Sequence, residues 1–305
     1  MRLAERCSQR GFTLVELVMV IVLMGVIGGM VAVFMKSPID AYFDTARRAG
    51  LTDVADTVVR RMARDIRKAL PNSIRSAGSQ CVEFIPTKAG GRYRVEPGGG
   101  GDVLDFTLAA GDSSFNMLGN NDYQIIPSDQ RIVGRDIRPV GGDWVAIYNL
   151  RIPGADAYAG DNIAEVASVS AGAGTPPESV ITLTSTSTST RQFPLESPNN
   201  RFQVIPGDEL VVRYVCVDAS GTNAQGHGNG TLYRQVLTTL PLLESTNCPA
   251  TVTGAAVMAQ RVSACNFNYS GSDLRRNALI SMRLQLTDSG ETVSLQHEVH
   301  VSNTP

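Results

Sequence analysis

An unbroken apolar run fills positions 12–35, and Glu16 is its only charged residue. Folded as a helix, the run would be ~36 Å long, enough to cross the ~30 Å of hydrocarbon in a bilayer. The alternative, a helix buried in a soluble domain, is rarely apolar on every side. The pattern therefore predicts a transmembrane helix over residues 12–35.

The residues before this run are basic, with Arg2, Arg6 and Arg10 against the single acid Glu5. Positive charge on this flank predicts a cytoplasmic N-terminus and places the rest of the chain on the outer side of the membrane. A cleaved secretory signal is the alternative, but it has a shorter apolar core followed by a small-residue cleavage site. Residues 34–38 fit such a site poorly, so we expect the helix to stay in the membrane.

Residues 36–70 are expected to extend this helix in an amphipathic form, with Ser37-Pro38 either starting a new turn or marking a kink. Apolar residues recur at every fourth position. This stripe consists of Val54, Val58, Met62, Ile66 and Leu70, widened by Ala55, Val59 and Ala69. The basic residues that largely avoid it are Arg47, Arg48, Arg60, Arg61, Arg64, Arg67 and Lys68. Pro71-Asn72 is predicted to end the helix, and we expect the stripe to pack on the chain's own sheet rather than on a partner protein.

From residue 71 onward, short strands alternate with turn clusters, which predicts a β-rich head over residues 71–305. The expected strands are 81–85, 103–108, 123–126, 144–150, 180–184, 209–217, 232–236, 263–269, 279–286 and 292–301. Glycine clusters at 98–101, 141–142 and 226–230 mark loops, and the Thr/Ser run 184–190 is expected to be a solvated strand or an extended loop. The fold class is therefore α+β, with one long helix packed on a large antiparallel head.

The last two strands form the clearest hairpin. The first alternates apolar and polar residues, with Ile280, Met282, Leu284 and Leu286 on its apolar face. Asp288-Ser289-Gly290 supplies the turn. The return strand presents Val293, Leu295, His297, Val299 and Val301. Residues 209–217 are apolar on both faces, so this strand is expected to be central in its sheet.

Composition and charge exclude several classes of function. Hydrophobic residues make up 43% of the chain, so most of it should fold. Lys plus Arg number 27 and Asp plus Glu number 29, which gives no bulk positive charge for binding nucleic acid. We found no Gly-x-Ser-x-Gly nucleophile motif and no phosphate-binding loop with its lysine. We therefore expect no enzymatic activity, no cofactor and no nucleic-acid partner.

The candidate metal ligands do not assemble into a recognisable pattern. His297-Glu298-Val299-His300 is one residue shorter than the zinc-protease motif, and its histidines should lie on opposite faces of a strand. The third histidine, His227, sits in a glycine loop. Possible oxygen ligands for calcium are Asp102, Asp105, Asp112, Asn120, Asn121 and Asp122, but their spacing matches no EF-hand. We therefore predict no metal site.

We expect Glu16 to have a positively charged partner, because an ionised carboxylate in lipid costs roughly 2.5–3.5 kcal/mol on insertion scales. No Lys or Arg lies within residues 12–35. If the chain were cut after Gly11, the new amine of Phe12 would lie four residues away on the same helix face. That amine could also belong to a neighbouring copy.

The run Arg10-Gly11-Phe12-Thr13-Leu14-Val15-Glu16, followed by an apolar helix, resembles the class III signal of type IV prepilins and type II secretion pseudopilins. The resemblance implies that residues 1–11 are a leader peptide. It implies that a prepilin peptidase in the bacterial inner membrane cuts between Gly11 and Phe12, and then N-methylates Phe12. It also implies that Glu16 pairs with the Phe12 amine of an adjacent subunit during filament growth. The subunit would then move from the inner membrane to a pilus at the cell surface, among other major and minor pilins.

Tyr214-Val215-Cys216 and the closing residues 300–305 are similar to minor pilins of the mannose-sensitive haemagglutinin type, and more loosely to J-type pseudopilins of type II secretion. The chain is longer than a typical major pilin, which indicates a low-copy minor subunit in filament assembly, initiation or the tip. A J-type pseudopilin remains the nearest alternative. A membrane-anchored periplasmic adhesin or enzyme is the alternative from another class.

Loss of the leader would remove Cys7 and leave Cys81, Cys216, Cys248 and Cys265 on the oxidising side of the membrane. Two disulfides are then expected, and three pairings are possible. We favour Cys248–Cys265, the pair closest in sequence, with Cys81–Cys216 as the remainder. Free buried thiols are the alternative.

Overall fold

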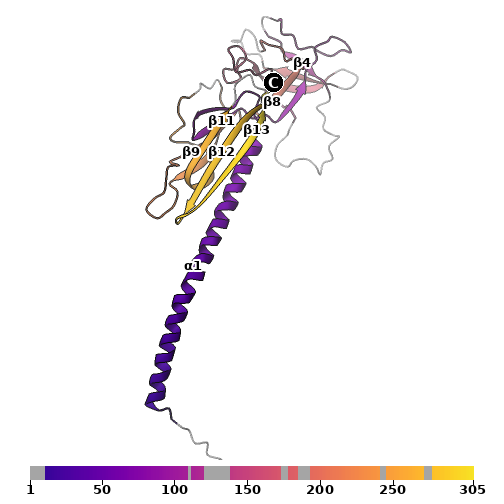
Figure 1. Cartoon of the computed structure of the whole chain (residues 1–305). Helices are drawn as coiled ribbons and strands as arrows, with labels where there is room; N and C mark the ends of the chain where they lie inside the picture. The colour runs from indigo at the N-terminus through magenta and orange to yellow at the C-terminus, as the bar shows by residue number, and fades with distance from the viewer. Residues whose placement is uncertain are drawn as a thin grey trace, which may run out of the picture. The chain divides into compact units, whose positions relative to one another are not determined.

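In the residues that it describes, the computed structural model has one helix followed by thirteen strands. Figure 1 shows the long helix α1 and several of these strands. The structure describes residues 11–108, 111–119, 138–172, 178–184, 193–240, 245–270 and 277–305. The predicted strand 123–126, most of the Thr/Ser run and the candidate calcium ligands 120–122 lie outside these ranges. The chain divides into two compact units with the boundary between Gly50 and Leu51, and the helix α1 (Leu14–Ile66) contributes to both.

In the first unit, α1 exposes its apolar side chains on every side. Met24, near the middle of the predicted span, is 69% exposed. In the described ranges, α1 is the one helix that is long and apolar enough to cross a membrane. Pro38 lies inside α1 without ending it, although a proline removes one backbone hydrogen bond. This half of the helix needs lipid or other helices around it.

The second unit buries one face of the end of α1. Its buried residues are Leu51, Ala55, Val58, Val59, Met62, Ala63 and Ile66. Val54, expected in the stripe, is 44% exposed. In a helix with 3.6 residues per turn, each side chain lies about 40° further around the axis than the one four residues before it. A long stripe with this spacing therefore moves off the face that contacts the sheet.

α1 ends at Ile66, four residues before the predicted end at Leu70. The backbone of the following residues pairs with another segment instead. The Thr87 N–H donates to the Lys68 carbonyl at 2.7 Å, and the Leu70 N–H donates to the Ile85 carbonyl at 2.8 Å. These bonds draw the chain out of the helix before Pro71 is reached.

The end of α1 packs on a seven-stranded antiparallel sheet. Its strands, in spatial order, are β1 (Arg75–Gly78), β2 (Cys81–Phe84), β9 (Val211–Val217), β10 (Gly230–Leu237), β11 (Ala256–Ser270), β12 (Asn277–Asp288) and β13 (Glu291–Ser302). Val58, Met62 and Ile66 share one core with residues of this sheet such as Tyr214 and Met282. The predicted packing of the helix on an antiparallel sheet is confirmed.

A polar contact also joins the helix to the sheet. The Tyr214 hydroxyl donates to Asp65 Oδ2 at 2.7 Å, and Arg234 Nε donates to the same oxygen at 3.0 Å. Burial raises the pKa of Tyr214, and the nearby Asp65 carboxylate raises it further. The phenol therefore stays protonated and keeps donating this hydrogen bond at neutral pH.

The predicted terminal hairpin is confirmed. Asp288 pairs with Glu291, and the two turn residues Ser289 and Gly290 have φ of 51° and 85°. Two positive φ values in a two-residue loop match the right-handed twist of the strands. The central position of β9 is also confirmed, since it lies between β2 and β10.

The second sheet has six strands: β3 (Ala89–Arg92), β8 (Arg201–Ile205), β5 (Trp144–Ala146), β6 (Ile163–Gly172), β7 (Glu178–Leu183) and β4 (Ser114–Met117), in spatial order. It closes on itself through a bridge between Tyr93 and Met117, which extends β3 toward β4. Phe115 and Phe202 meet edge to face inside it at 5.5 Å. No residue of α1 belongs to the described core of this sheet.

The expected strand 103–108 is wrong. Asp105 Oδ1 accepts a hydrogen bond from the Thr107 N–H at 2.7 Å, which is a local turn. Such side-chain to backbone bonds compete with strand pairing.

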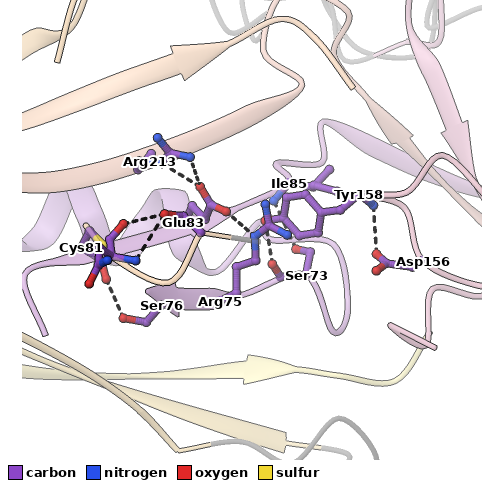
Figure 2. A network of polar contacts seen from close by, with 11 residues as sticks. Ser73, Arg75, Ser76, Cys81, Glu83, Ile85, Asp156, Tyr158 and Arg213 are labelled. Carbon is purple, nitrogen blue, oxygen red and sulfur yellow. Dashed lines mark hydrogen bonds and ion pairs between the residues drawn. The ribbon is translucent and has the colours of Figure 1, made fainter. Parts of the chain in front are cut away.

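A buried polar network joins the two sheets (Figure 2). Glu83 lies between Arg75 on β1 and Arg213 on β9, and pairs with both. The Arg75 guanidinium lies 3.6 Å from the centre of the Tyr158 ring, and the Tyr158 hydroxyl donates to the Ser73 carbonyl at 2.8 Å. Since Tyr158 lies between β5 and β6, this network ties the second sheet to the first. Burial raises the pKa of Tyr158, which keeps its hydroxyl a donor.

All four described cysteines form disulfides, but the favoured pairing is wrong. The bonds are Cys81–Cys248 and Cys216–Cys265, with Cα–Cα distances of 5.5 and 6.4 Å. Cys216 and Cys265 lie in the core under α1, whereas Cys248 lies in a loop beside the β1–β2 hairpin. The expected pairing was wrong because it rested on closeness in sequence, whereas long-range strand pairing decides which cysteines meet.

We predict that Ile66→Ala lowers the free energy of unfolding of the head by about 2–5 kcal/mol, because it leaves a cavity between the helix and the sheet. The exposed Val54→Ala should change it by less than about 0.5 kcal/mol. Denaturant unfolding of the detergent-solubilised full chain, followed by near-UV circular dichroism, measures both. Equal effects at the two positions would contradict the buried face described here.

Glu83→Gln should destabilise the head by about 3–5 kcal/mol, because it leaves two buried guanidinium groups without their shared anion. The exposed Glu298→Gln on β13 is the matched control and should have little effect. The same unfolding measurement serves here. A loss no larger than that of the control would show that the network does not hold the two sheets together.

Candidate processing and assembly site

The start of α1 is built by a threonine cap. The Leu17 N–H donates to the Thr13 carbonyl at 3.1 Å, and the Glu16 N–H donates to Thr13 Oγ1 at 3.3 Å. Thr13 is therefore the N-cap, and Glu16 occupies the third helical position. Thr-x-x-Glu is the sequence signature of a capping box. Our sequence analysis missed this role of Thr13, although the spacing alone indicates it.

Gly11 and Phe12 lie before the helix and are exposed. Phe12 is 83% exposed, and a Cβ added to Gly11 would meet no atom within 4 Å. A peptide bond between two such residues has room for a protease on every side. The structure therefore places the predicted cleavage point outside the first helical turn. Arg10 lies outside the described residues.

The Glu16 carboxylate lies in the first turn of α1, where the helix dipole favours a negative charge. Within the described part of the chain, no cation forms an ion pair with it. The dipole offsets only part of the cost of a charge in lipid, about 0.3–1 kcal/mol against roughly 2.5–3.5 kcal/mol. The remaining cost favours a positive partner from outside the described chain.

The described residues of the head hold no cluster of three or more metal-binding side chains. The candidate calcium ligands that are described bond within the protein instead. Ser114 Oγ donates to Asp102 Oδ2 at 2.6 Å, and Asp112 Oδ2 accepts the Asp105 N–H at 2.8 Å. The Thr107 hydroxyl and N–H lower the pKa of Asp105.

The histidines do not converge either. His297 is half-buried on the helix side of β13, while His300 is exposed on the opposite face. His227 Nδ1 lies 2.8 Å from Asp288 Oδ1 and also accepts the Ser289 N–H at 3.1 Å. The glycine loop thus packs against the turn between β12 and β13.

Comparison with known proteins identifies the N-terminal segment. Residues 6–32 match the family model of the prokaryotic N-terminal methylation motif. The chain carries a prepilin methylation signal. The match includes Gly11, Phe12 and Glu16, and it supports the place of the chain in the type IV pilin and pseudopilin family. No curated protein and no solved structure matches the chain.

The prepilin signal explains why the exposure of Gly11 and Phe12 before the helix matters. It implies processing by a prepilin peptidase and a general setting of pilin assembly. A cut at the predicted point between Gly11 and Phe12 would fall before α1 and leave the apolar helix in the mature subunit. This agrees with a single-pass membrane anchor.

We predict that Gly11→Trp leaves an uncut prepilin, because the bulky ring fills the space that the peptidase needs. Gly11→Ala is the control and should still be cut. Intact-mass spectrometry of membrane-extracted protein distinguishes a chain that keeps residues 1–11 from one that begins at N-methylated Phe12. A mature mass for the tryptophan variant would contradict this cleavage point.

Proposed function

We propose that this chain is a non-enzymatic minor pilin of a type IV pilus of the mannose-sensitive haemagglutinin kind, acting in filament initiation, assembly or the tip. The observation that carries the proposal is a methylation signal joined to a head whose described residues form three clusters of buried hydrophobic side chains. The N-terminus would face the cytoplasm and the head the periplasm before assembly.

The size of the head supports a low copy number. The seven-stranded sheet alone covers the end of α1, as a pilin-like head requires. The six-stranded sheet adds a second core that contains no residue of α1. In a thin filament each head must fit among its neighbours around a bundle of helices. A head with this additional sheet fits most easily where neighbours are few, at an end of the filament.

The exposed apolar helix permits assembly, and Glu16 supplies a driving force for it. Side chains of α1 lose no apolar environment when they leave lipid for a bundle of similar helices. The Glu16 carboxylate gains a positive partner there if it meets the amine of a processed neighbour. The charge pair then selects the axial register, while contacts between heads choose the neighbours.

A J-type pseudopilin of type II secretion is the second candidate, because the same methylation signal and helix serve both assemblies. The two differ in the partners of the head. Localisation decides between them. A minor pilin is found in sheared surface filaments, and its deletion reduces piliation. A pseudopilin stays with the cell, and its deletion blocks export of folded proteins.

We predict that Glu16→Val still enters the membrane, because it makes the helix more apolar, but is at least roughly tenfold depleted from sheared filaments. Tenfold corresponds to a loss of about 1.4 kcal/mol of pairing energy. Glu16→Asp keeps the charge and should be depleted less. Quantitative immunoblotting of membrane and filament fractions measures the ratio.

Undiminished incorporation of the valine variant would exclude a role for the Glu16 charge in assembly. An anchored adhesin or enzyme predicts that outcome, since its head would work without any filament.

A further inference from the structure

Two arginines face each other on the second sheet, and no described acidic residue pairs with either. Arg92 on β3 and Arg201 on β8 are directly opposite in the strand register, and both are exposed. Neither forms an ion pair within the described part of the chain. Like charges in opposite positions destabilise a strand pair. Within the described residues, this local repulsion between the two guanidinium groups is therefore not neutralised by an ion pair.

The next outward-facing pair in the same register hollows the surface beside these arginines. Gln203 lies opposite Gly90, on the same side of the sheet as Arg201 and Arg92, because side chains alternate along strands. An open cavity of about 350 Å³ lies here, lined by Gly90, Gly91, Arg92, Leu118, Arg201, Phe202 and Gln203. None of these lining residues is acidic.

Gln203, which lines the cavity, also has an unused hydrogen-bond acceptor. Gln203 Oε1 is buried and has no partner in the described structure. Along β8 the outward face changes from the buried Ile205 through the half-buried Gln203 to the exposed Arg201. The amide therefore lies at the inner end of the cavity and the arginines at its mouth. A buried polar atom without a partner costs stability unless a ligand satisfies it.

We propose that this cavity, formed by Arg92, Arg201 and Gln203, binds an acidic sugar residue. Guanidinium groups match the planar, bidentate geometry of a carboxylate. A ring hydroxyl next to the carboxylate is the donor that Gln203 Oε1 lacks, and it reaches this buried oxygen when the amide turns toward the cavity. The volume lies at the low end of the range for small-ligand sites, which suits one terminal ring of a saccharide rather than a long polymer strand.

The arginine pair and the amide can be tested separately by calorimetric titration of the full mature chain in detergent. The probes are trigalacturonate, the neutral trisaccharide maltotriose, and acetate. The wild-type chain should bind trigalacturonate in preference to both others. Arg92→Gln and Arg201→Gln should each weaken that binding at least tenfold. Gln203→Leu should reduce the preference for trigalacturonate over acetate. Arg61→Gln on α1 is the matched control and should bind as the wild type.

Thermal unfolding gives a second readout that a merely structural role of the arginines would not produce. At low salt and without ligand, Arg201→Gln should raise the melting temperature, because it removes the repulsion, and high salt should abolish the difference. Trigalacturonate should raise the melting temperature of the wild type and not of the variant.

Four results would each overturn the proposal. Three are equal binding of maltotriose and trigalacturonate, unchanged binding in both arginine variants, and a lower melting temperature of ligand-free Arg201→Gln. The fourth is binding of acetate as tight as that of trigalacturonate, which would exclude a sugar as the ligand. None of these outcomes depends on filament assembly, so the site and the proposed minor-pilin role stand or fall separately.

Discussion

α1 has to satisfy two different environments with one continuous backbone. Its first half is apolar all round, with Glu16 as the only charge before Lys36, whereas its last turns are apolar on the face that Val58 and Met62 share. The first pattern is stable only among lipid tails or other helices, and the second only against a sheet. The head can therefore fold around the end of α1 whether the first half lies in a membrane or in a filament.

The sequence was most informative where local rules decide the structure. The apolar run and the hairpin turn at Ser289-Gly290 each depend on a few neighbouring residues, and both were predicted correctly. The Gly11–Phe12 junction is equally local and lies within the residues that the family model matches. The Thr13 cap follows the same kind of local rule and could have been predicted from the Thr-x-x-Glu spacing. Val54 was misplaced because a small rotation per turn accumulates over several turns.

The remaining features depend on contacts between distant segments. Strands β3, β4 and β8 are only four or five residues long and too short to show a period. The partners of Cys248 and Cys265 follow from how the sheets fold, which spacing does not encode. The arginine cavity arises because Arg92 and Arg201, more than a hundred positions apart, fall into register. Neither residue is unusual in its own stretch of sequence.

The Cys81–Cys248 bond has a mechanical consequence. Its covalent loop of 167 positions encloses everything from β3 to β10, and the whole second sheet is an insertion between the neighbouring strands β2 and β9. When tension enters along α1 and leaves through β12 and β13, the bond offers a direct route from one end of this loop to the other. The inserted sheet then carries little of the pulling force. A ligand bound to this sheet would remain bound while the subunit is under tension.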